Sequence, residues 1–125
     1  MKKCILVTLA LIAVPAFTFS AEVLTPQAIA NRFFEYFLKD GNVEAIDYFM
    51  GLNPKLKANA AQVQKMKDQL AGAVRVYGKP LAVESVSVED LTPSLQRRVY
   101  ITKHSNRPLV WEMYFYKSVG EWMPD

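Results

Sequence analysis

Residues 95–117 read LQRRVYITKHSNRPLVWEMYFYK, two runs of alternating side chains separated by a stretch that ends in proline. The runs 95–103 and 109–117 are rich in β-branched and aromatic residues, a composition that is typical of half-buried strands. A loop over 104–108 would join them as a hairpin. The C-terminal half of the chain is therefore predicted to form an antiparallel sheet.

The register of this hairpin can be predicted by placing like side chains opposite one another. Setting Lys103 against Leu109 brings Val99 opposite Met113 and gathers the apolar side chains of both strands on one face. The reverse face then carries a mixed aromatic and charged set, a composition found at interfaces. The inner set is Val99, Ile101, Trp111, Met113 and Phe115, and the outer set is Arg98, Tyr100, Glu112, Tyr114 and Tyr116.

His104 is the only histidine, and this register places it in the loop. A loop histidine has few neighbours to orient it, so we expect a solvated surface residue. The single cysteine, Cys4, lies in the first twenty residues, and no second histidine is present to complete a zinc set. The sequence therefore predicts no metal site and no cofactor.

Before Pro80 the apolar spacing is helical rather than alternating. Thr25 can cap a helix with its hydroxyl, and Pro26 sits where its missing amide costs nothing. Aromatic residues then recur at helical spacing up to Gly41, which predicts the end of the helix. The predicted helices cover residues 25–40, 42–50 and 59–76.

The strand expected over 81–88 changes its apolar parity between Val83 and Val86, which a bulge near Glu84 would explain. At the other end of the sheet, only two residues follow a turn before Pro124, so a fourth strand can barely begin. The order of elements predicts an α+β fold, in which three helices cover a curved antiparallel sheet of three to four strands.

The first twenty residues have the features of an export signal. Lys2 and Lys3 precede an apolar run over 5–17, and small residues at 18 and 20 favour cleavage before Ala21. The run is shorter than the ~20 residues needed to span a bilayer. We therefore expect a cleaved signal peptide over 1–20, a single domain over 21–125, a periplasmic or extracellular location, and no membrane attachment after processing.

The formal net charge is +3, and Lys2 and Lys3 contribute two of these charges. The processed chain would be nearly neutral, which gives no electrostatic argument for nucleic-acid binding. It would also lack cysteine, so its fold must be held by packing rather than by a disulfide.

Three segments of the chain are similar to small exported bacterial proteins of unassigned function in the NTF2-like (cystatin-like α+β cone) superfamily. These are Tyr77 to Leu81, Val99 to Ile101, and Trp111 to Lys117 followed by Trp122. The resemblance covers residues 25–123 and implies a pocket between the helices and the curved sheet. The pocket residues that it implies are Phe33, Tyr36, Phe37, Val99, Trp111, Met113 and Phe115.

Three functions are compatible with this reading. The first is an exported, non-enzymatic domain that binds a small apolar molecule or a protein, and it is favoured because no set of ionisable groups converges on the aromatic interior. The second is a cofactor-free enzyme of the isomerase or hydrolase type, in which Asp47 on an apolar helix face acts as the base. The third is assembly as a homodimer through the outer face of the sheet.

Overall fold

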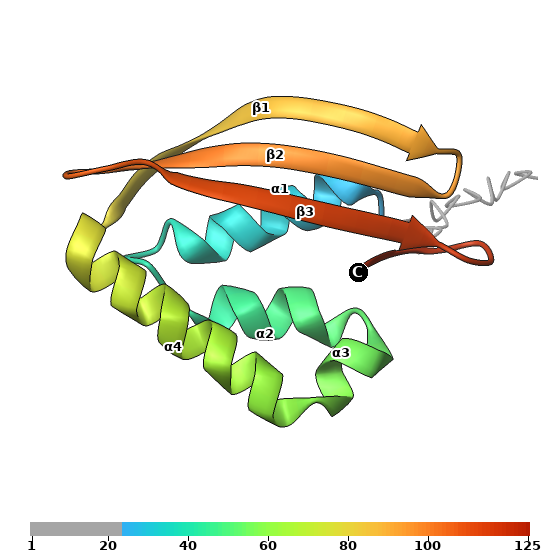
Figure 1. The fold of residues 1–125 in the computed structure, drawn as a ribbon, viewed down its shortest axis with the longest axis horizontal. Helices are drawn as coiled ribbons and strands as arrows, with labels where there is room; N and C mark the ends of the chain where they lie inside the picture. The colour runs from blue at the N-terminus through green and yellow to red at the C-terminus, as the bar shows by residue number, and fades with distance from the viewer. Residues whose placement is uncertain (1–23) are drawn as a thin grey trace, which may run out of the picture.

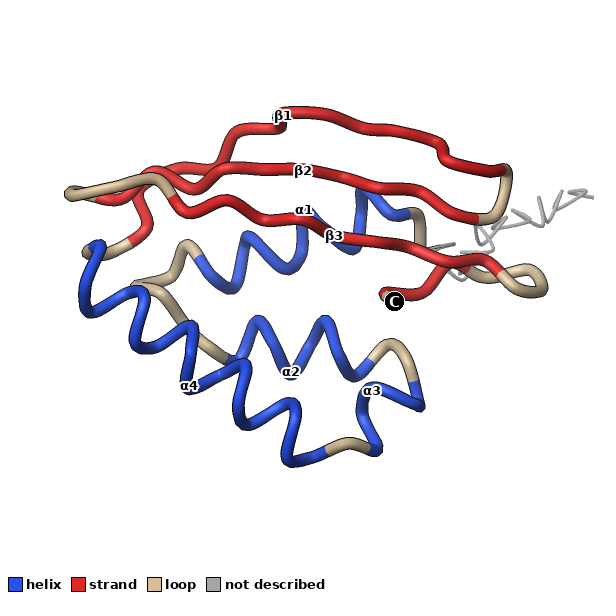
Figure 2. Tube along the Cα trace, in the orientation of Figure 1, coloured by secondary structure: helices blue, strands red, loops and turns tan. Residues whose placement is uncertain are grey.

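The helices and strands form two layers in the computed structural model, which describes residues 24–125 (Figures 1 and 2). Within these residues four helices precede four strands, the segregation that is typical of an α+β fold. The helices are α1 (Pro26–Phe37), α2 (Glu44–Gly51), α3 (Pro54–Ala58) and α4 (Ala60–Tyr77), and the strands are β1 (Pro80–Thr92), β2 (Leu95–His104), β3 (Leu109–Lys117) and β4 (Trp122–Pro124). The predicted signal peptide and Cys4 lie outside the described residues. Within the described part of the chain, no helix is both long enough and apolar enough to cross a membrane.

The helices begin where side chains can cap them. The Thr25 hydroxyl accepts a hydrogen bond from the Ala28 amide at 3.1 Å, with Pro26 in the first turn as predicted. The short helix α3 lies between the second and third helices predicted from the sequence. Asn53 caps it and Pro54 occupies its first position. The structure therefore has one helix more than the sequence predicted.

The sheet has the order β1-β2-β3-β4, and each pair of neighbours is antiparallel. A register shift between Ser85 and Ser87 confirms the expected bulge, close to the predicted position. The fourth strand has only three residues, which agrees with the expectation that it could barely begin. It is held in place because the Asn53 side-chain amide donates a 2.7 Å hydrogen bond to the Pro124 carbonyl.

The predicted register of the central hairpin is wrong by one residue. Thr102, rather than Lys103, lies opposite Leu109, and β2 continues through His104. Because strand side chains alternate between faces, the slip exchanges the two faces of β2. Tyr100 and Arg98, expected on the outer face, point toward the helices, whereas Val99 points away from them. The structural reason is that Tyr100, Thr102 and His104 are buried, while Lys103 is exposed and pairs with Glu84.

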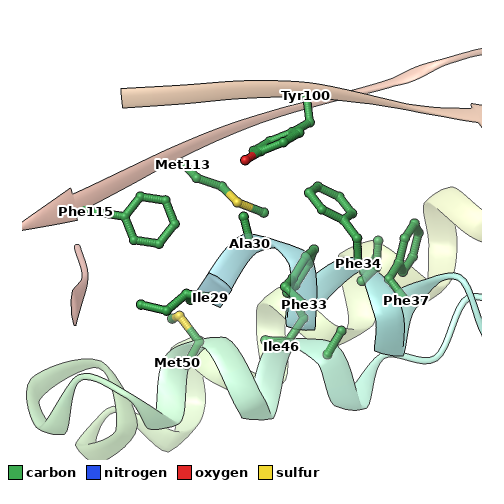
Figure 3. Close-up of a cluster of buried hydrophobic side chains, with 12 residues drawn as sticks. Ile29, Ala30, Phe33, Phe34, Phe37, Ile46, Met50, Tyr100, Met113 and Phe115 are labelled. Atoms are coloured by element: carbon green, nitrogen blue, oxygen red, sulfur yellow. The ribbon is translucent and has the colours of Figure 1, made fainter. Parts of the chain in front are cut away.

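The core lies between α1 and the inner face of the sheet. Figure 3 shows the aromatic side chains of α1 beside those of β2 and β3, with Ile46 and Met50 approaching from α2. Figure 1 shows that α1 lies directly against the sheet, while α2, α3 and α4 lie farther from it. Gly41 joins α1 to α2 with φ 73°, and a Cβ there would come within 2.9 Å of Val74. This connection therefore depends on glycine.

Candidate functional site

The space in which a ligand pocket was expected is filled by aromatic side chains. The Trp111 ring packs edge-to-face against Phe37 at 5.1 Å and against Phe33 at 5.2 Å between ring centroids. Met113 and Phe115 are buried beside them. Four of the predicted pocket residues, Phe33, Phe37, Met113 and Phe115, therefore form packed core.

Two other predicted pocket residues lie elsewhere. Tyr36 packs against Tyr48 at 5.5 Å, with the Arg32 guanidinium 5.3 Å from its ring centre. These contacts place Tyr36 beside partly buried and exposed residues of α1 and α2. Val99 lies on the outer face of the sheet because of the corrected register. Neither side chain converges with Trp111.

Trp111 itself is only partly buried, although it packs against α1 as expected. Its open side lines a hollow of about 220 Å³ between α4 and β3, which we call the Trp111 groove. Gln69 supplies the only polar side chain of this lining; every other lining side chain is apolar. The lining residues are Ile46, Met66, Gln69, Leu70, Ala73, Leu109, Val110 and Trp111.

A chain of hydrogen bonds fixes the indole of Trp111. Its Nε1 donates to the Thr102 hydroxyl at 2.9 Å, and that hydroxyl lies 2.8 Å from His104 Nε2. His104 Nδ1 lies 2.8 Å from the Gly78 carbonyl at the end of α4. The expectation that His104 is a solvated loop residue is therefore wrong. His104 is buried, and its hydrogen bonds connect the sheet to the end of α4.

Asp47 lines a different hollow, of about 400 Å³, between α2 and α4. Its carboxylate pairs with Lys67 Nζ at 2.8 Å, and its side chain is 49% exposed. The enzymatic hypothesis required an acid removed from water in a pocket mouth. That premise is wrong, because Asp47 is solvated and paired with an opposite charge.

The outer face of the sheet carries a network of charged and phenolic groups. Arg97 lies 3.1 Å from Glu112 and 3.5 Å from Glu89, and Tyr114 donates a hydrogen bond to Glu112. Hydrogen bonds from Tyr114 and Arg97 lower the pKa of the Glu112 carboxyl. Glu112, Tyr114 and Tyr116 therefore lie on the face predicted for them, whereas Arg98 and Tyr100 do not.

Among the described residues, no group of three or more histidine, cysteine, aspartate or glutamate side chains could hold a metal ion. The α4 side of the Trp111 groove, Met66, Leu70 and Ala73, was not predicted as a site. Its signal is present in the sequence, because apolar residues between 63 and 74 recur at helical spacing on one side of the predicted helix over 59–76.

The sequence matches no protein-family model and no curated protein. Among solved structures, the chain is similar to an NTF2-like transpeptidase from Campylobacter jejuni, with a TM-score of 0.59 and 10% sequence identity. The match covers 81% of this chain and 97% of the other. The chain therefore has an NTF2-like fold, in agreement with the sequence resemblance.

Proposed function

We propose that this domain is an exported, non-enzymatic binding protein that holds a small apolar ligand in the Trp111 groove. The observation that carries the proposal is the partly exposed indole of Trp111, held by Thr102 on one side and open to an apolar groove on the other. Ligand sites are typically hollows with apolar walls and few polar groups. The export signal predicted over residues 1–20 supports the proposed periplasmic or extracellular location.

The size of the Trp111 groove limits its ligand. Its volume of about 220 Å³ lies below the ~300–1,000 Å³ of sites for drug-sized molecules. One six-membered ring with a short substituent would fill it. Burial of about 150 Å² of apolar surface gives roughly 4 kcal/mol before the cost of association, so we expect a Kd of about 1 mM or weaker.

The first test uses the indole of Trp111 as its reporter. Toluene is expected to shift the Trp111 Nε1–H resonance in 1H–15N NMR spectra and to saturate in the millimolar range, because the ring would lie against the indole. Ala73→Phe is expected to weaken this binding at least about tenfold, since the new side chain fills the groove. Titration of both proteins with toluene measures the effect.

The matched control is Lys65→Ala, which changes the same helix at an exposed position outside the groove. It should leave toluene binding unchanged. Equal binding by wild type and Ala73→Phe, or the absence of any Trp111 shift up to the solubility limit of toluene, would contradict the proposal.

A second candidate function is self-association through the outer face of the sheet. Val110 is 65% exposed and Tyr116 is 43% exposed on this face, beside the Arg97 and Glu112 network. The corrected register adds Val99 and Ile101 to it, so the face is more apolar than the sequence predicted. It also carries both signs of charge, which allows a two-fold related copy to place acids opposite bases. We propose a second copy of this chain as the partner of this face.

If this face forms a dimer, Ile101→Lys should raise the dimer dissociation constant at least about tenfold, because an uncompensated charge would be buried at the centre of the interface. Sedimentation equilibrium of wild type and variant measures this change. Lys65→Ala on α4 serves again as the control. A wild-type protein that sediments as a monomer at about 1 mM, where even weak association is populated, would remove this function.

A further inference from the structure

The inner face of β2 carries an arginine, Arg98, that no carboxylate of residues 24–125 neutralises. Arg98 lies opposite Met113 and is partly buried. Its neighbour on the outer face, Arg97, is also partly buried but contacts both Glu89 and Glu112. Within the part of the chain that the structure describes, no carboxylate lies within 4 Å of Arg98. A partly buried guanidinium of this kind is a candidate site for an anion.

The described hydrogen bonds of Arg98 go to neutral side chains. Nε donates to Gln96 Oε1 at 2.6 Å, and Nη1 donates to the Tyr100 hydroxyl at 3.1 Å. The Gln96 amide is oriented by Asp90, which accepts a 2.8 Å hydrogen bond from its nitrogen. A guanidinium has five N–H groups, so these two bonds leave three, one on Nη1 and two on Nη2. These N–H groups can donate charge-assisted hydrogen bonds to a carboxylate.

A hollow with both apolar and polar lining residues lies beside Tyr100, between α1 and the strands β1 and β2. Its volume is about 390 Å³, and we call it the Tyr100 hollow. The Tyr100 ring packs against Phe34 at 4.9 Å, and Figure 3 shows its hydroxyl on the side of Met113, the residue opposite Arg98. Arg98 therefore lies at one end of Tyr100 and the hollow lies along its ring. The lining residues are Asn31, Phe34, Glu35, Leu38, Val83, Ser85 and Tyr100.

The charges around the Tyr100 hollow select the orientation and the charge of a ligand. Glu35 lies on its lining and would repel an anionic group there. Asp90 lies beyond Gln96 and reduces the attraction of this region for a doubly charged phosphate. A singly charged carboxylate at Arg98, with its apolar chain along Phe34 and Val83, satisfies both constraints.

We propose that Arg98 and the Tyr100 hydroxyl bind the carboxylate of a small amphiphile whose apolar chain lies in the Tyr100 hollow. This site is distinct from the Trp111 groove. The Phe34 ring separates them, since it packs against Tyr100 on one side and against Trp111 at 5.8 Å on another. The inference therefore goes beyond the proposed function and stands on different residues.

Octanoate is the probe, and isothermal titration calorimetry measures its binding. Arg98→Gln should weaken octanoate binding at least about tenfold, because the ionic hydrogen bonds are lost. Arg97→Gln is the matched control on the opposite face and should change it less than about twofold. In wild type, 1-octanol and acetate should each bind at least about tenfold more weakly than octanoate, because each lacks one half of the recognised structure. Tyr100→Phe, which keeps the ring, should weaken octanoate binding about threefold and provides a second test if Arg98→Gln fails to fold.

Three results would overturn the site. These are octanoate binding by Arg98→Gln within about twofold of wild type, equal binding of 1-octanol and octanoate, and no octanoate binding by wild type up to about 10 mM. Ala73→Phe separates this inference from the proposed function, because it fills only the Trp111 groove and should leave octanoate binding unchanged. If Ala73→Phe abolishes octanoate binding while Arg98→Gln retains it, the carboxylate site is wrong and the Trp111 groove is the binding site.

Discussion

Phe33→Ala is expected to destabilise the domain by about 3–5 kcal/mol. Phe33 is 1% exposed and packs against four rings, those of Phe34 at 5.1 Å, Phe37 at 6.4 Å, Phe49 at 5.5 Å and Trp111 at 5.2 Å. Its removal leaves a cavity at the point where α1, α2 and β3 meet. Since domains of this size are stable by only about 5–15 kcal/mol, much of that margin would be lost.

Urea denaturation followed by circular dichroism measures this effect. Glu35→Ala is the control on the same helix, because its side chain is exposed and its pairing with Arg32 at 3.7 Å is weak. It should change the free energy of unfolding by less than about 0.5 kcal/mol. A Phe33→Ala variant that lost less than about 1 kcal/mol would contradict this packing and would mean that the aromatic cluster is loosely packed.

The helices and the overall fold class could be predicted because their signals are local. Thr25 and Pro26 together mark a helix start, because the hydroxyl caps the first turn and proline needs no amide there. Gly41 marks the helix end because glycine readily adopts the positive φ, here 73°, that follows a helix. The bulge in β1 could be predicted from a parity change within one strand. The short helix α3 was missed because its Asn53 and Pro54 are also typical of a polar loop.

The hairpin register could not be predicted from apolar matching, because the inner face of β2 is largely polar. Thr102 and His104 are buried by bonding to one another and to Trp111, so their polarity does not expose them. Val99 and Ile101 are apolar yet lie on the outer face. Matching apolar residues therefore assigned the wrong face of β2 to the core. In the structure Arg98 lies on the inner face and Arg97 on the outer face, the reverse of the predicted register.

The sequence also could not predict whether the space between α1 and the sheet is an open pocket or a filled core. Phe33, Phe37 and Trp111 have the composition of a ligand pocket and of a packed core alike. Which of the two forms depends on how closely α1 approaches the sheet, and centroid distances near 5 Å show that the rings fill the space. Sequence reasoning did select Trp111, the one predicted pocket residue that lines the proposed groove.

His104→Ala is expected to destabilise the domain by about 2–4 kcal/mol. The side chain is 8% exposed, and its two ring nitrogens each lie 2.8 Å from a partner, the Thr102 hydroxyl and the Gly78 carbonyl. Because the carbonyl can only accept, Nδ1 must carry a proton, and Nε2 of the neutral ring then accepts from Thr102. Removal of the imidazole leaves both partners without this bond and opens space beside Phe37. Chemical denaturation measures the loss.

Two further variants show whether these hydrogen bonds are the cause. His104→Asn can still donate to Gly78 through its amide, so its cost should be smaller than that of alanine. Lys103→Ala, at the adjacent exposed position, should change stability by less than about 0.5 kcal/mol, because its pairing with Glu84 is solvated. His104→Ala should also shift the Trp111 Nε1–H resonance, because Thr102 receives that bond and loses its own acceptor. Similar small effects at positions 103 and 104 would instead place His104 in a solvated loop, as the sequence-based register predicted.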